Sequence, residues 1–137
     1  MNTYSIEDKQ YVNSEEFKNF MEQNPTYGYL RIRAYAASGA IPISGLKIEI
    51  TTKINKNRFI FFEGYTNESG LIDNISLPAP KLETNNLDIP NKTIYEIKAT
   101  YLPNNTNLTY EVNMYENVFV VQNINIVPNS SIEKGVI

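Results

Sequence analysis

The sequence lacks cysteine and histidine altogether, and it has no tryptophan. Without thiol or imidazole groups the chain cannot form a structural zinc site, an iron–sulfur cluster, or a Ser-His-Asp or Cys-His nucleophilic apparatus. Most hydrolytic and redox chemistry is thereby excluded, and carboxylates remain as the acid–base groups. The sequence therefore predicts no cofactor, no metal site and no catalytic residue.

Size and charge narrow the class of protein further. A chain of 137 residues is long enough for one domain with a short extra segment. Its net charge of -3 offers no positive field for a phosphate backbone, so we expect no nucleic-acid binding. Apolar runs of about 18 residues are absent, which predicts no membrane insertion. The first eight residues lack a secretory signal, leaving open the cytoplasm of a forming spore or an envelope-associated location.

Residues 1–26 form a polar, acidic arm with one predicted helix. Asn13 can cap its start, because Glu16 stands three residues later as in a capping box. Phe17, Phe20 and Met21 then share one face of the helix. This face either packs on its own domain or docks a protein partner.

From residue 27 to residue 128 the hydrophobic period changes to two, which is typical of half-buried strands. Short strands separated by Gly, Pro and Asn turns predict an all-β fold, a seven-stranded antiparallel sandwich of Ig-like type. The expected strands are 27–35, 46–51, 58–65, 71–77, 93–101, 109–114 and 117–127. Residues 129–137 have little apolar content and are expected to fray.

Asparagine and proline mark the expected connections. The segments 55–57 and 104–107 are Asn-rich and suit hairpin turns, because Asn tolerates positive backbone angles. The segment 78–92 holds three prolines and no period, which predicts a long loop.

Several motifs in order resemble a known family. They are the strand Leu30-Arg31-Ile32, the turn at 39–45 before the strand 46–50, the turn at 66–70, Leu77-Pro78-Ala79-Pro80, the strand around Tyr95, and Ile126-Val127-Pro128. Together they resemble carboxypeptidase regulatory-like domains, which have the prealbumin-like sandwich, over about residues 28–128. The elements at 77–80 and 126–128 look most like the accessory domain of clostridial spore cortex-lytic enzymes and related cell-wall proteins.

The resemblance implies an accessory role. We expect a non-catalytic structural or binding module of a bacterial envelope or spore-associated assembly, not an enzyme, acting through a protein partner or self-association. Prealbumin-like hydroxyisourate hydrolases need histidines, which this chain lacks. Related pilin domains form a Lys–Asn isopeptide bond with a catalytic acid. Here Asn123 or Asn125 and Glu96 match, but the first strand offers Arg31 and Arg33, which cannot act as the amine nucleophile.

Tyrosine and arginine are the best candidates for a binding surface. They alternate along the first strand, so one sheet face could collect rings and guanidinium groups able to stack on sugars or bind a protein. The candidate residues are Tyr27, Tyr29, Arg31, Arg33, Tyr35 and Tyr65. The alternative function is a small protein that binds or processes carbohydrate, with cell-wall glycan as its partner. A structural interpretation explains the same tyrosines: their amphipathic rings pack at the edge of the core.

Carboxylates could form a catalytic pair or a calcium site. The pairs considered are Glu15 with Glu16, and Glu63 with Glu68. Asp73 with Asn74, or Asn67 with Glu68, could supply oxygen ligands to calcium. A solvated face and turn-forming side chains explain the same residues, and we favour those interpretations.

Overall fold

The computed structural model describes residues 3–5, 14–83, 91–103 and 105–127. Within them it contains nine strands, one α-helix and one 3₁₀ turn. In chain order these are β1 (Thr3–Ser5), α2 (Glu15–Gln23), β2 (Thr26–Ala36), η1 (Ala37–Gly39), β3 (Ile41–Pro42), β4 (Lys47–Ile54), β5 (Asn57–Tyr65), β6 (Leu71–Ala79), β7 (Thr93–Tyr101), β8 (Thr106–Met114) and β9 (Phe119–Asn125).

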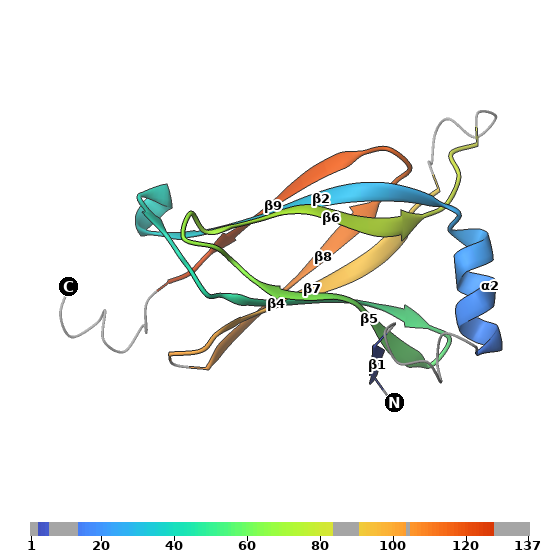
Figure 1. Cartoon of the computed structure of the whole chain (residues 1–137), viewed down its shortest axis with the longest axis horizontal. Coiled ribbons are helices and arrows are strands. Elements are labelled where there is room, and N and C mark those ends of the chain that lie inside the picture. The colour runs from blue at the N-terminus through green and yellow to red at the C-terminus, as the bar shows by residue number, and fades with distance from the viewer. Residues whose placement is uncertain (1–2, 6–13, 84–90, 104, 128–137) are drawn as a thin grey trace.

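The strands form two packed sheets, with α2 at one end of the sandwich (Figure 1). One sheet has five strands in the order β1-β5-β4-β7-β8. The other has four, and β2 is its central strand because it pairs with β3, β6 and β9. No helix among the described residues is long and apolar enough to cross a bilayer.

This architecture confirms the predicted β-sandwich with one short helix, and it corrects two details. The described residues hold nine strands rather than seven, because β1 and β3 are short additions to the seven predicted ones. The sandwich is also not fully antiparallel, since β9 runs parallel to β2 and β1 runs parallel to β5. The chain crosses from one sheet to the other between β8 and β9, and so β9 reaches β2 in the same direction.

The core lies between the sheets and follows the alternation of the strands. Leu30, Ile32 and Ala34 of β2 face inward against Ile48 and Ile50 of β4 in one buried cluster. Tyr95 of β7 is also fully buried, and its hydroxyl donates a hydrogen bond to the Pro78 carbonyl at 2.5 Å. Inward apolar side chains thus leave the alternate positions of each strand for the two outer faces.

Helix α2 packs on its own sandwich. The Phe17 ring lies 5.8 Å from that of Phe59 and 6.1 Å from that of Phe61, measured between centroids, and Phe20 and Met21 pack beside them. Phe17, Phe20 and Met21, considered above for partner docking, therefore make contacts within the chain. Ser14 caps the helix by accepting from the Phe17 amide, in place of the expected Asn13, which lies outside the described residues.

The Asn turns lie where the sequence predicts them, but the predicted loop at 78–92 does not begin at residue 78. Asn55 and Asn105 have positive φ angles of 57° and 55° at hairpin turns, as expected. Pro78 and Ala79, however, extend β6, where Pro78 is opposite Tyr27 of β2. A proline fits there because β6 pairs on one side only. Residues 84–90 of the predicted loop and the tail 129–137 lie outside the described residues.

Candidate functional site

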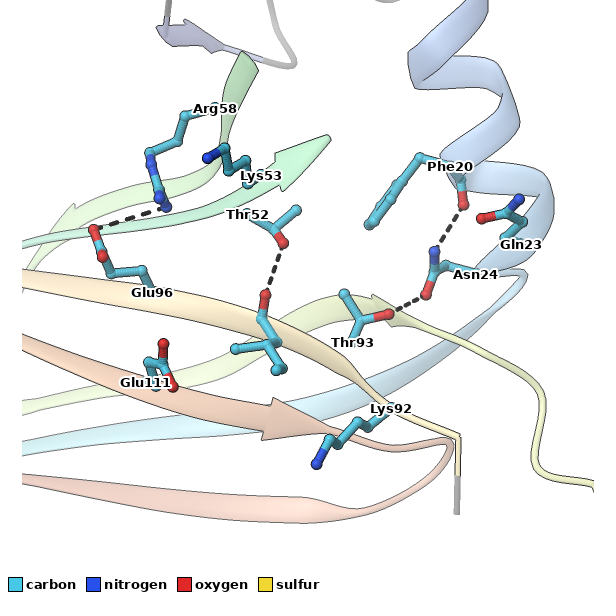
Figure 2. Close-up of a pocket in the computed structure, with 11 residues that line it drawn as sticks. Phe20, Gln23, Asn24, Thr52, Lys53, Arg58, Lys92, Thr93, Glu96 and Glu111 are labelled. Carbon is cyan, nitrogen blue, oxygen red and sulfur yellow. Dashed lines mark hydrogen bonds and ion pairs between the residues drawn. The ribbon is translucent and has the colours of Figure 1, made fainter. Parts of the chain in front are cut away.

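A cavity of about 510 Å³ lies on the outer face of the five-stranded sheet, at the end covered by α2 (Figure 2). Strands β4, β5, β7 and β8 supply its floor, and the C-terminal half of α2 supplies one wall. Phe20 lies on that wall, and Thr52 lies on the floor opposite (Figure 2). We call this hollow the end cavity.

Charged side chains dominate the lining of the end cavity. Three cations, Lys53, Arg58 and Lys92, line it together with two carboxylates, Glu96 and Glu111. The formal charge of this lining is +1, from three positive and two negative groups, whereas the whole chain carries -3. A locally positive hollow on an acidic protein attracts small anions.

The two carboxylates face each other across paired strands. Glu96 of β7 and Glu111 of β8 are direct cross-strand partners in the antiparallel ladder. Tyr95 and Ile97 on either side of Glu96 are buried in the core, so alternation points Glu96 outward. Directly opposed residues place their Cβ atoms about 5 Å apart, which brings two carboxyl groups to one site.

Arg58 of β5 reaches Glu96 across the intervening strand β4. Its Nη1 lies 3.8 Å from Glu96 Oε1 and donates a hydrogen bond to the Thr51 hydroxyl at 2.9 Å. Half-exposed ion pairs of this kind contribute little to stability, about 1 kcal/mol or less. The guanidinium is held in place by two groups and still presents further N–H donors to the cavity.

Polar groups at the rim already have partners. The Asn24 amide donates to the Phe20 carbonyl at 2.8 Å, and its oxygen accepts from the Thr93 hydroxyl. The Thr52 hydroxyl donates to the Ile94 carbonyl at 2.7 Å (Figure 2). The bond between Thr93 and Asn24 fastens the end of α2 to β7, and the bond between Thr52 and Ile94 joins β4 to β7. The charged side chains are therefore the groups that can meet a ligand.

The predicted tyrosine and arginine surface is largely brought together. Tyr27, Tyr29, Arg31, Arg33 and Tyr35 alternate with buried residues and so share the outer face of β2. Tyr65 does not join them, because it belongs to β5 in the other sheet.

The arginines of this row have partners that the sequence alone did not indicate. Arg31 forms an ion pair with Asp73 of β6, and its guanidinium lies 6.0 Å from the centre of the Phe119 ring. Arg33 lies 5.2 Å from the Tyr35 ring. Such cation–π contacts are worth about 0.5–1 kcal/mol at exposed sites. The row is therefore an ordered surface rather than a set of free side chains.

Other candidate sites are not assembled. Glu96 lies on the outer face of the five-stranded sheet, whereas Asn123 and Asn125 are exposed on β9 of the other sheet, so no isopeptide triad forms. Asp73 is engaged by Arg31, and Asn67 Oδ1 accepts from the amides of Ser69 and Leu71 within its own turn.

Likewise, the predicted carboxylate pairs differ from the observed one. Glu16 accepts hydrogen bonds from the side chains of Asn55 and Asn57 and so fastens the helix. Lys53, Arg58, Lys92 and Glu111 were missed as site residues. For Lys53, Arg58 and Glu111 the signal is an outward position on strands of one sheet, which becomes visible only when the register of those strands is known. Lys92 directly precedes β7.

Comparison with known proteins identifies the fold. No protein family and no curated protein sequence matches the chain. Klebsiella pneumoniae 5-hydroxyisourate hydrolase is a solved structure that resembles it, with a TM-score of 0.52, 15% identity, and coverage of 74% of this chain and 91% of that one. This likeness shows the prealbumin-like fold. (S)-Allantoin synthase aligns with a TM-score of 0.49 and 10% identity over 76% of this chain, which spans only 42% of that enzyme.

The comparison corrects the functional prediction. The sequence predicts a non-catalytic structural or binding module and not an enzyme, but a solved structure that shares its fold is a hydrolase. The prealbumin-like sandwich is therefore no argument for a purely structural role, and that prediction is wrong as made. At 15% identity the likeness shows the fold alone and carries no substrate.

Proposed function

We propose that this chain is an enzyme that acts on a small anionic molecule in the end cavity. The observation that carries the proposal is the placement of Glu96 and Glu111 as direct cross-strand partners in a hollow that also holds three cations. Carboxylate pairs facing one cavity supply general acid–base catalysis where imidazole is absent. The fold likeness to a hydrolase supports this class of function.

Each charged group has a role that follows from its position. One carboxylate takes a proton from an attacking water, and the other delivers a proton to the leaving group. Arg58, held between Thr51 and Glu96, binds an oxyanion of the substrate and stabilises the negative charge that develops in the transition state. Lys53 and Lys92 add positive charge to the lining of the cavity.

The first substrate to test is the one named for the structural neighbour. 5-Hydroxyisourate is small enough for a cavity of about 510 Å³, and this chain must process it without histidine. Esters such as p-nitrophenyl acetate and p-nitrophenyl phosphate provide an uncharged and an anionic alternative. We expect the chain to hydrolyse an anionic compound faster than an uncharged one, because the lining carries net positive charge.

Three variants test the assignment by steady-state kinetics. We expect Glu96→Gln and Glu111→Gln each to lower kcat by about 10²-fold or more, since general acid–base groups contribute that much. Arg58→Met should raise KM and also lower kcat, because Arg58 binds the substrate oxyanion and stabilises the charge that develops in the transition state. Glu68→Gln, in an exposed turn away from the cavity, is the matched control. Full activity in the two cavity variants, or no turnover of any of the three compounds, would overturn the proposal.

Two finer predictions from the sequence stay proposals. A cell-wall glycan or a protein could bind the Tyr and Arg row on β2, and pull-down with purified peptidoglycan tests the glycan. Replacement of Tyr29 and Tyr35 with alanine should abolish retention if that row is the contact. The similarity to the accessory domain of spore cortex-lytic proteins likewise stays a prediction.

A further inference from the structure

Within the described residues, strand β9 forms an edge of the four-stranded sheet. The Tyr29 amide donates to the Val118 carbonyl and the Ile126 amide to the Tyr35 carbonyl, so the even-numbered residues of this segment face β2. In a parallel ladder the odd-numbered residues then direct their amide and carbonyl groups away from β2. β9 pairs with no other strand in the described part of the chain.

Only part of that edge has a hydrogen-bond partner. The backbone of Asn125 hydrogen-bonds the Tyr110 hydroxyl, and the Asn123 carbonyl accepts from the Gln122 side chain at 3.0 Å. The backbone groups of Phe119 and Val121 and the amide of Asn123 have no partner among the residues that the structure describes. An edge with a row of such groups is a template for pairing with another strand.

The other long edges carry features that block pairing, and β9 does not. β6 has a bulge opposite the segment from Leu30 to Ile32 of β2. At this bulge Asp73 adds a charge and Asn74 has a φ of 60°. β8 carries Glu111. By contrast, β9 is the only described strand of more than three residues without a charged side chain, and its register with β2 runs without a bulge.

The exposed face beside the start of this edge carries apolar side chains, and further along Arg31 and Arg33 of β2 lie beside Val121 and Asn123. Phe119 is 55% exposed and Val121 is 45% exposed, and Tyr29, the partner of Phe119 on β2, is 37% exposed. Contiguous exposed apolar side chains next to an open edge mark an interaction site. A charged partner strand would find no opposite charge on β9, which argues for an equally uncharged partner.

We propose that β9 pairs antiparallel with β9 of a second copy of this chain, about a two-fold axis at Val121. Because Val121 directs its backbone groups outward, it meets its own copy as a hydrogen-bonded pair, and Phe119 lies opposite Asn123. The segment is self-complementary and brings no like charges into opposition, although the whole chain carries -3. The pairing joins two four-stranded sheets into one and places Val121 of one copy against Val121 of the other.

Light scattering after size exclusion tests the oligomeric state. We expect a dimer, and we expect Val121→Lys to raise its dissociation constant at least tenfold by opposing two ammonium groups at the axis. Thr109→Lys on the exposed side of β8 adds the same charge away from β9 and should leave the dimer intact. The proposal would be overturned if the wild-type chain is monomeric at a concentration of about 100 micromolar, or if Val121→Lys does not weaken the dimer.

Cross-linking fixes the register independently of affinity. The chain has no cysteine, so a single one can be introduced without competition. Opposed residues of a hydrogen-bonded antiparallel pair have Cα atoms about 5.5 Å apart, within the range of a disulfide. Val121→Cys should therefore form a covalent dimer under mild oxidation, and Thr109→Cys should not. Equal oxidation of the two variants would exclude the two-fold pairing.

Discussion

At the scale of single residues, Tyr95 joins the two sheets by one hydrogen bond in the core. Its ring is fully buried on β7, and its hydroxyl reaches the Pro78 carbonyl of β6. Burial raises the pKa of Tyr95 well above the ordinary value of 10.0, and the nearby Tyr27 adds to the rise. The neutral hydroxyl is thus required for the native packing.

Tyr95→Phe tests this bond. The ring stays, but the buried carbonyl loses its donor, so we expect the free energy of unfolding to fall by about 1–3 kcal/mol in urea titrations at neutral pH.

The same variant makes a pH prediction with a definite sign. Above about pH 10 an unfolded tyrosine releases its proton, whereas native Tyr95 keeps it, so stability is lost as pH rises through this range. Tyr95→Phe lacks this loss, and its stability should decline less steeply than that of the wild type. Tyr110, whose pKa burial also raises, is common to both proteins. If the free energy of unfolding declined equally with pH in the wild type and in Tyr95→Phe, this role of Tyr95 would be contradicted.

Gly28 of β2 lies against the end of β8, where there is no room for a side chain. A Cβ added there would lie 2.3 Å from Met114 Sδ and 2.6 Å from the Tyr115 carbonyl oxygen. We expect Gly28→Ala to destabilise the chain by about 1–3 kcal/mol, as overpacking does. Replacing Met114 with alanine should relieve part of that penalty, because the carbonyl remains. Strict additivity of the two changes in urea titrations would rule out the contact.

At the scale of elements, α2 forms both the end of the core and a wall of the candidate site. Phe17 packs on the rings of Phe59 and Phe61, and Phe20 and Asn24 line the end cavity. A nine-residue helix is marginal in isolation, so its order depends on this docking. Loss of docking should therefore be local rather than global.

Phe17→Ala tests the docking of α2. Removing a buried phenylalanine costs about 3–5 kcal/mol when the loss is global. Here we expect fast hydrogen exchange in residues 17–23 while the amides of β4 and β7 stay protected. The affinity of the end cavity for its ligand should also fall, because α2 forms one wall of that cavity. Glu22→Gln, on the exposed side of the helix, is the control and should leave exchange unchanged.

Most of the strands and the helix could be predicted from the sequence, but the pairing between distant strands could not. Alternation located the seven main strands, and Asn55 located a hairpin, because both depend on neighbours in the chain. The parallel pairing of β2 with β9 could not be predicted, since the two strands are far apart in sequence. Glu96, Glu111 and Arg58 meet only through strand register, which is why the end cavity was missed.

At the scale of the whole molecule, the last strand closes the sandwich. Ile124 and Ile126 are almost fully buried, and β9 covers seven successive residues of β2 from Tyr29 to Tyr35. Burying each isoleucine contributes about 1.5–3 kcal/mol, against a total stability of about 5–15 kcal/mol for a domain. Without β9, the remaining strands should therefore retain little of the free energy of unfolding.

Truncation tests this closure. A chain that ends at Tyr115 should show no cooperative urea transition by circular dichroism, because it lacks the buried residues of β9 and an edge of β2. A chain that ends at Val127 keeps every described strand and should unfold cooperatively. Equal transitions for the two chains would show that β9 is dispensable for folding.

The parallel alignment of β2 and β9 also determines how the molecule bears tension. Force applied at Thr26 and at Asn125 pulls the two strands lengthwise in opposite directions, so all the bonds of the seven-residue ladder are loaded at once in shear. An antiparallel closing strand would instead be peeled away one bond at a time. The chain should therefore be mechanically strong for its size, with a rupture force governed by this single pair of strands.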